Sequence, residues 1–280
     1  MSVVAPAAAA PPRGWVRYAV AAGVVAAWMA AGWACHLDAN SYLLLGVPLL
    51  LVFQLLVARR PVLELWFDRP DRVALPWWGW LVAAAFMVLP IHDQMTWENP
   101  GLATRLWLVA ASCGAVPLAL SVARCTRSQW RELAACAGLT GLIALFTLLP
   151  GFFLNGHAPK PAADRLLEFA RSLTLYLPVV FVLEEVFFRG GLDPYLARAD
   201  RGPPWPAAFF ISALWGWWHL PIVPFGAGNA VARMAVLVIV LPLVHCAVGV
   251  PFTFFRRRSG ILLVPAAAHA FIDALRNALQ

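Results

Sequence analysis

The sequence predicts an all-α, polytopic integral membrane protein with about eight or nine transmembrane helices. Three observations predict this fold class: 62% of the 280 residues are hydrophobic, only 12% are charged, and the mean hydropathy is +0.74. Soluble domains contain roughly 25% charged residues. A soluble fold of this length could not bury so much apolar surface, so lipid is the expected solvent for most of the chain.

The apolar segments define the expected helices, since a spanning helix needs about 20 mainly apolar residues. Residues 1–14 are rich in Ala and Pro and are predicted to be a disordered tail. The first apolar run is too long for a signal peptide and is interpreted as a retained span. Nine segments are predicted: 15–35, 41–58, 77–93, 105–123, 133–154, 166–190, 205–221, 233–255 and 261–279. We divide them into N-terminal helices without a recognised motif (15–160) and a C-terminal helical core (161–280).

The basic residues predict the orientation, because cytoplasmic loops of membrane proteins are rich in arginine. With the N-terminus in the cytoplasm, the outer loops contain mainly Lys160, Arg165 and Arg233. The inner loops then contain Arg59, Arg60, Arg69, Arg72, Arg124, Arg127, Arg131, Arg198, Arg201, Arg256, Arg257 and Arg258. Residues 59–75 are expected to be a cytoplasmic loop or an interfacial helix.

Other compositional features exclude several classes of protein. The net charge of +7 comes from scattered loop residues rather than one basic face, so no nucleic-acid partner is predicted. The five dispersed cysteines form no C-x-x-C pair and indicate neither a disulfide framework nor a zinc knuckle. One lysine among 21 basic residues indicates a GC-rich bacterial genome. The expected location is therefore the bacterial cytoplasmic (inner) membrane.

Ionisable residues inside apolar spans are costly and are candidates for function. The first group is in the sequence Leu183-Glu184-Glu185-Val186-Phe187-Phe188-Arg189-Gly190. Glu185 and Arg189 are four residues apart and can pair on a helix, whereas Glu184 points about 100° away. This spacing suggests that Arg189 fixes Glu185 while Glu184 stays available as a general base. The alternative is an interfacial Glu/Arg pair at a helix end.

The second group is Trp215-Gly216-Trp217-Trp218-His219-Leu220-Pro221. Trp215 and His219 are one helical turn apart, and Gly216 would let a neighbouring helix approach closely. The alternative is an interfacial tryptophan belt with a structural histidine. His245, in the next span, is left unassigned.

The third group is His269-Ala270-Phe271-Ile272-Asp273, where His269 and Asp273 are again one turn apart. Such a pair can bind a metal ion together, or the carboxylate can orient the imidazole. A structural His–Asp hydrogen bond is the alternative.

Convergence of the three groups would give each buried charge a partner. The site is therefore expected among the four C-terminal spans. Since the sixth and seventh spans run antiparallel, Glu184 can reach the depth of His219 only if the sixth helix continues past Gly190, Gly191 and Pro194 towards Arg198. We predict that it does, with a kink.

In order and spacing, the three groups resemble the CPBP family of CAAX prenyl proteases and bacteriocin-processing enzymes, also called the Abi family. Its pattern is E-E-x-x-x-R, then F-x-x-x-H, then H-x-x-x-N or a similar polar residue, on separate helices. Glu184, Glu185 and Arg189 match the first motif, and His219 matches the second, with Trp215 in place of the usual Phe. His269 matches the third, with Asp273 where many relatives have Asn. The resemblance covers about residues 165–280.

The resemblance implies a hydrolase, an intramembrane endopeptidase that cuts a membrane-anchored protein or peptide. By analogy, Glu184 with help from His219 would activate a water molecule. His269 and Asp273 would stabilise the oxyanion, and Glu185 and Arg189 would hold the site in shape. Residues 161–280 would then be the catalytic core.

Asp273 raises alternatives, because an ionised Asp cannot donate a hydrogen bond and would repel an oxyanion. Three roles for Asp273 are open: it is protonated, it only orients His269, or it helps to bind a cation. The last option would make a zinc site of His219, His269, Glu184 and Asp273. There is no H-E-x-x-H sequence, and the metal-free glutamate mechanism without cofactor is favoured.

Two other functions remain as alternatives. The chain could be a non-catalytic immunity or scaffold protein of the same family. It could also be a proton-coupled transporter, since buried Glu, His and Arg also form proton relays. The sequence lacks the internal repeats common in transporters. The expected partners are the lipid bilayer and a membrane-anchored substrate.

Overall fold

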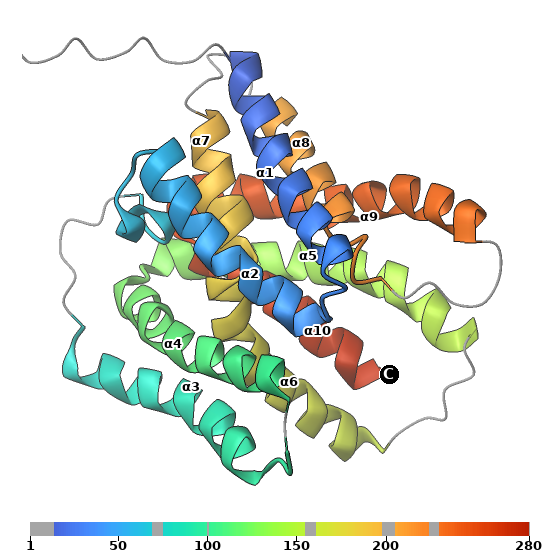
Figure 1. Cartoon of the computed structure of the whole chain (residues 1–280). Coiled ribbons are helices and arrows are strands. Elements are labelled where there is room, and N and C mark those ends of the chain that lie inside the picture. Colours follow the sequence, from blue (N-terminus) through green and yellow to red (C-terminus); the bar gives the residue numbers. More distant parts are fainter. Residues whose placement is uncertain are drawn as a thin grey trace, which may run out of the picture.

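The computed structural model describes residues 14–68, 75–99, 101–154, 161–197, 205–223 and 230–279 (Figure 1). The predicted disordered tail, residues 1–14, lies outside the described residues except for Gly14. Also outside are Arg69, Arg72, Lys160, Arg198 and Arg201. Within the described residues the regular structure is helical, and extended pairing is limited to an isolated bridge between Phe67 and Ile261.

Each of the nine predicted spans corresponds to a helix. The long helices are α1 (Gly14–Ala34), α2 (Ala39–Val52), α3 (Trp77–Thr96), α4 (Leu102–Arg124), α5 (Arg127–Leu154), α6 (Ala162–Val182), α8 (Trp205–Trp218), α9 (Ala230–Ser259) and α10 (Leu263–Leu279). Short helical segments are η1 (Phe53–Val57), η2 (Val62–Leu65), η3 (Val186–Leu192) and α7 (Asp193–Ala197). The predicted all-α fold class is confirmed.

Five helical segments of the described chain are long and apolar enough to cross a membrane by themselves. They are Gly14–Ala34, Ala39–Val57, Leu102–Arg124, Ala162–Ala197 and Val231–Ser259. Many large apolar side chains on these helices face outward, among them Leu243 and Ile239 of α9, which are 65% and 62% exposed. An apolar exterior of this kind requires lipid rather than water, so the protein is a multi-pass membrane protein.

The helices pack in pairs around one core. α10 contacts α6 and α5, α8 contacts α9, and α3 contacts α4 (Figure 1). The N-terminal helices also contribute to this core: the ring of Trp28 on α1 lies 4.9 Å from that of Phe187 and 5.0 Å from that of Trp218. Tyr42 on α2 donates a hydrogen bond to the carbonyl of Trp218 at 2.8 Å. α1 and α2 therefore support the helices that carry the motifs.

Asp38 starts α2 as a helix cap. Its carboxylate accepts hydrogen bonds from the backbone N–H of Asn40 and Ser41 and from the Ser41 hydroxyl. Such a cap satisfies amide groups that have no partner inside the helix. These hydrogen bonds, led by the Ser41 hydroxyl, lower the pKa of Asp38.

The segment after α2, expected to be a loop or an interfacial helix, is partly buried. η2 is a short 3₁₀ helix whose Leu65 is 1% exposed, and Phe67 behind it is 3% exposed. The carbonyl oxygen of Leu65 lies so close to Gly190 of η3 that a Cβ there would be 2.4 Å from it. Glycine at position 190 therefore allows the backbones of η2 and η3 to touch.

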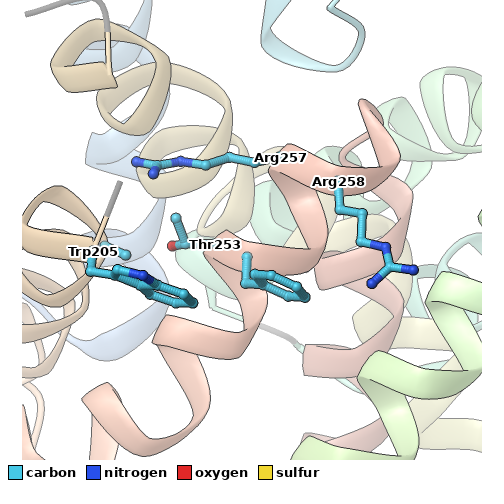
Figure 2. A pocket seen from close by; sticks show the side chains of 6 residues that line it. Trp205, Thr253, Arg257 and Arg258 are labelled. Atoms are coloured by element: carbon cyan, nitrogen blue, oxygen red, sulfur yellow. The ribbon is translucent and has the colours of Figure 1, made fainter. Parts of the chain in front are cut away.

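The three arginines at the end of α9 each bind an acid on a different element. Arg256 Nη2 lies 2.8 Å from Asp68 Oδ1, Arg257 Nε lies 3.1 Å from Asp193 Oδ2, and Arg258 Nε lies 2.8 Å from Glu132 Oε1. We call these residues, Arg256, Arg257 and Arg258, the α9 arginines. Figure 2 shows the side chains of Arg257 and Arg258 pointing to opposite sides of α9. The contacts join segments that the arginine pattern placed on one side of the membrane.

A surface cavity of about 480 Å³ lies beside these arginines, between α8 and α9 (Figure 2). It is lined by Trp205, Ala208, Thr253, Phe254, Arg257 and Arg258. The rings of Trp205 and Phe254 are stacked with their planes 6° apart. No lining residue belongs to the three motifs, so this cavity is separate from the candidate site.

Candidate active site

Helical structure continues past Glu184 and Glu185 after the sixth helix, as predicted. α6 ends at Val182, a turn holds Leu183 and Glu184, and the chain then forms the π-helix η3 and the short helix α7. The helical segment, interrupted by this turn, runs to Ala197, and Arg198 lies outside the described residues. π-helical turns often occur at functional sites. Here the turn places both glutamates at the point where α6 gives way to η3.

Glu185 and Arg189 form the predicted pair. Arg189 Nη1 lies 3.0 Å from Glu185 Oε1, and neither side chain is exposed. The same oxygen of Glu185 accepts a hydrogen bond from Nδ1 of His269 at 2.9 Å. Room for the guanidinium comes from Gly249 on α9, where a Cβ would lie 2.6 Å from Arg189 Nη2. Glu185 is thus held from two sides.

Glu184 is held more loosely. Its Oε2 accepts a hydrogen bond from the indole Nε1 of Trp215 at 3.2 Å and lies 3.9 Å from Nε2 of His269. Its Oε1 has no hydrogen bond or ion pair to any of the described residues. The side chain keeps 14% of its surface exposed. Glu184 therefore retains an oxygen that can accept a proton.

Trp215 and His219 face the cluster from α8 and the turn after it. Trp215 is 3% exposed and Trp218 is fully buried, so these two rings are core residues and the interfacial-belt alternative is wrong for them. Gly216 allows α9 to approach, as predicted, because a Cβ there would lie 2.6 Å from Cα of Pro242. His219 Nδ1 lies 2.8 Å from the carbonyl oxygen of Trp215. A carbonyl only accepts, so His219 carries its proton on Nδ1 when neutral, with Nε2 as an acceptor.

His245, which the sequence left unassigned, belongs to the same cluster. Its ring lies 4.3 Å from that of His219 and 4.6 Å from that of Trp215. Its Nδ1 lies 2.7 Å from the carbonyl oxygen of Leu241, so the neutral ring again has Nε2 as an acceptor. No motif includes α9. The only sequence signal for His245 was therefore its polar side chain within an apolar span.

His269 and Asp273 are on α10, one turn apart as predicted. Nε2 of His269 lies 3.6 Å from Asp273 Oδ2. Asp273 also pairs with Arg276, whose Nη2 lies 3.2 Å from Oδ1. Arg276 is a second residue that the motifs did not indicate. It lowers the negative charge around His269, which is surrounded by three carboxylates.

All six predicted site residues therefore lie in one cluster: Glu184, Glu185, Arg189, His219, His269 and Asp273. Glu184 contacts Trp215 and His269 rather than His219. For the zinc alternative, the described part of the chain contains no group of three or more His, Cys, Asp or Glu side chains placed to hold a metal ion.

Comparison with known proteins identifies the segment that carries the cluster. Residues 167–275 match the family described as type II CAAX prenyl endopeptidase Rce1-like. The match begins in α6 and ends in α10, so it includes all three motifs and His245. The family resemblance inferred from the motifs is confirmed for this segment. No curated protein and no solved structure matches the chain.

Proposed function

We propose that this protein is an intramembrane endopeptidase that hydrolyses a peptide bond in a membrane-associated protein or peptide. The observation that carries the proposal is the contrast between the two adjacent glutamates. Glu185 binds Arg189 at 3.0 Å and His269 at 2.9 Å, and its remaining oxygen is fully enclosed. The partly exposed Glu184 accepts one hydrogen bond, from Trp215, and lies farther from His269, at 3.9 Å. A structural charge cluster would pair both. A hydrolase that uses a glutamate as general base needs one carboxylate that can still take a proton.

In the proposed mechanism, Oε1 of Glu184 takes a proton from a water molecule as the water oxygen attacks the carbonyl carbon of the substrate. The carbonyl oxygen becomes an oxyanion. When the C–N bond breaks, the proton passes from Glu184 to the departing amine. His219 assists this transfer, because Nε2 of its neutral ring is an acceptor. The balance needs only water and no metal ion.

The oxyanion would be stabilised by His269. Its Nδ1 donates to Glu185, and its Nε2 lies between Glu184 and Asp273. Surrounding carboxylates favour an imidazolium, whose second N–H can donate to a developing oxyanion. Of the roles considered for Asp273, the contacts favour the one in which it orients His269, with Arg276 offsetting its charge.

The proposed location is a bacterial cytoplasmic membrane with the N-terminus in the cytoplasm. The support is that inner-loop segments predicted from the arginine pattern meet in space. Besides the α9 arginines, Gln129 donates a hydrogen bond to the carbonyl of Ser259 at 2.8 Å. Segments assigned to opposite sides of a bilayer could not make these contacts.

The test is cleavage of a membrane-anchored reporter peptide by purified protein in nanodiscs. General acid–base groups contribute about 10²–10⁴-fold to rate, so we expect Glu184→Gln to lower kcat by at least about 10²-fold. The matched control is Glu168→Gln on α6, the helix just before Glu184, where Glu168 accepts a hydrogen bond from Ser172 outside the cluster. The control should cleave at the wild-type rate, and both variants should unfold at the wild-type temperature.

Full activity of Glu184→Gln would refute the glutamate mechanism. Zinc bound stoichiometrically to purified protein, with cleavage lost on chelation and restored by zinc alone, would favour the metal mechanism instead. Proteoliposome flux that requires Glu184 would indicate a transporter. A cellular function that survives Glu184→Gln and His269→Ala together would indicate a non-catalytic protein.

A further inference from the structure

Trp215 lies at the centre of the motif residues. Its ring centroid is 4.6 Å from that of His245, 5.0 Å from that of His269 and 5.6 Å from that of His219. The guanidinium carbon of Arg189 lies 4.4 Å from the same ring. One buried indole thus contacts side chains from η3, α9 and α10. The residue is positioned to do more than fill space.

The polar edge of this indole points at Glu184, where Nε1 donates to Oε2 at 3.2 Å. In the pattern that the segment resembles, this position is a phenylalanine. A phenyl ring could occupy the same core but could not donate a hydrogen bond. The tryptophan therefore adds an interaction with the proposed base that the pattern lacks.

We propose that Trp215 is a positioning residue that holds the Glu184 carboxylate through its indole N–H and leaves the other carboxylate oxygen directed at the attacking water. This inference rests on the proposed function. The indole N–H of Trp215 is a neutral donor, and this affects how strongly Glu184 can accept a proton. An ion pair like that of Arg189 with Glu185 would compete for the proton-accepting carboxylate, whereas an indole favours the ionised form without cancelling its charge.

The ring itself is fixed from several sides. Arg189 lies over it at a distance suited to a cation–π contact. His245 meets it edge to face, with an interplanar angle of 86°. Phe252 of α9 is a further neighbour, with ring centroids 6.0 Å apart. Rotation of the indole away from Glu184 would break all of these contacts, so the hydrogen bond is pre-organised.

Other charged and titratable groups also face Glu184, and a test of the indole must separate their effects. Those that act on Glu184 are Glu185, Arg189, His269 and Asp273. The cluster also contains His219, His245 and Arg276, which contact other members of it. Replacement of Trp215 by Phe changes none of these groups. It removes the indole N–H and makes the ring smaller, but keeps an aromatic side chain, and Trp217→Phe makes the same change in ring size.

The experiment compares Trp215→Phe with Trp217→Phe. Both tryptophans are on α8 and both donate from Nε1, but Trp217 donates to the carbonyl of Val238, outside the cluster, at 2.8 Å. A hydrogen bond to a charged group contributes enough that Trp215→Phe should lower kcat by about 10- to 100-fold. The acidic limb of the pH–rate profile should move up by about one to two pH units. Trp217→Phe should leave kcat and the profile unchanged.

Equal kcat and equal pH profiles for Trp215→Phe and wild type would overturn the inference. So would equal losses in the two variants, because these would indicate general damage to α8. A lower kcat with an unchanged profile would likewise reduce Trp215 to a packing role.

A second measurement does not depend on cleavage. The infrared band of the protonated Glu184 carboxyl, assigned by its loss in Glu184→Gln, should appear at higher pH in Trp215→Phe than in wild type. If the wild type cleaves no peptide but this shift is observed, the proposed function fails while the positioning contact stands. If the wild type cleaves and the band does not shift, the positioning contact fails alone.

Discussion

The α9 arginines and the motif cluster are both rich in charge, but they distribute it differently. At the end of α9, each arginine binds one acid, and the three acids come from three separate segments. In the motif cluster, partners are shared: His269 lies near Glu184, Glu185 and Asp273, and Glu185 binds both Arg189 and His269. The ion pairs of the α9 arginines thus join separate segments of the chain to the end of α9.

Exposure separates the two regions further. The side chain of Arg258 is 60% exposed and that of Asp68 is 51% exposed, whereas those of Arg189 and Glu185 are fully buried. Arg256 and Asp193 are themselves buried, but each ion pair at the end of α9 has one partner that reaches water, so one partner each is enough. Buried charges must satisfy one another. Two features therefore distinguish the candidate site from the structural contacts at the end of α9. Its charged side chains are buried and share partners, and one carboxylate, Glu184, is held less tightly than the others.

The largest effect on stability is expected from Arg189→Met, which leaves Glu185 buried without its guanidinium. Breaking a buried ion pair by removing one partner costs about 3–5 kcal/mol. The free energy of unfolding, measured by denaturant titration in mixed micelles, should fall by that amount. The double variant Glu185→Gln/Arg189→Met should lose less than Arg189→Met alone, because no unpaired charge remains. Equal losses in the single and double variants would contradict the buried-pair explanation.

A smaller effect is expected from Gly190→Ala, which tests the close contact between η3 and η2. The added Cβ would lie 2.4 Å from the backbone oxygen of Leu65. Overpacking of this kind costs about 1–3 kcal/mol. The matched control is Gly138→Ala on α5, where a Cβ would meet nothing within 4 Å, and which should gain about 0.5–1 kcal/mol. A stabilised Gly190→Ala protein would show that the two backbones do not touch.

The smallest effect is expected from Arg258→Gln at the end of α9. An exposed ion pair contributes about 0–1 kcal/mol, so unfolding should change by no more than that and cleavage should keep its wild-type rate. High salt should reduce the difference between this variant and wild type, because it screens exposed charges. A loss as large as that of Arg189→Met would remove the distinction between the two regions.

Much of this molecule could be predicted from the sequence. Each of the nine predicted apolar runs lies in helical structure among the described residues, because such a run has few other stable conformations in lipid. Five helical segments there are long and apolar enough to cross a membrane. The pairing of Glu185 with Arg189 followed from helical spacing alone. The extension of the sixth helix beyond Gly190 followed from the need to bring Glu184 near the depth of His219.

Other features could not be read from the chain. His245 and Arg276 belong to no motif, and their roles depend on how α9 and α10 rotate about their axes. The tryptophans of α8 resemble an interfacial belt in sequence, yet Trp215 and Trp218 are buried because α1 and α9 cover that face. Residues 59–68 contain enough charge to suggest a loop, yet Leu65 packs into the core.

By itself, the sequence determined the solvent, the helices and the residue types available for chemistry, because these follow from hydropathy and from the short-range geometry of the helix. Only the tertiary structure decided which residues of other helices contact each glutamate, His269 for Glu185 and Trp215 for Glu184. That choice depends on contacts between η3, α8 and α10, and side chains more than 30 positions apart in sequence make them. Local periodicity carries no information about such distances.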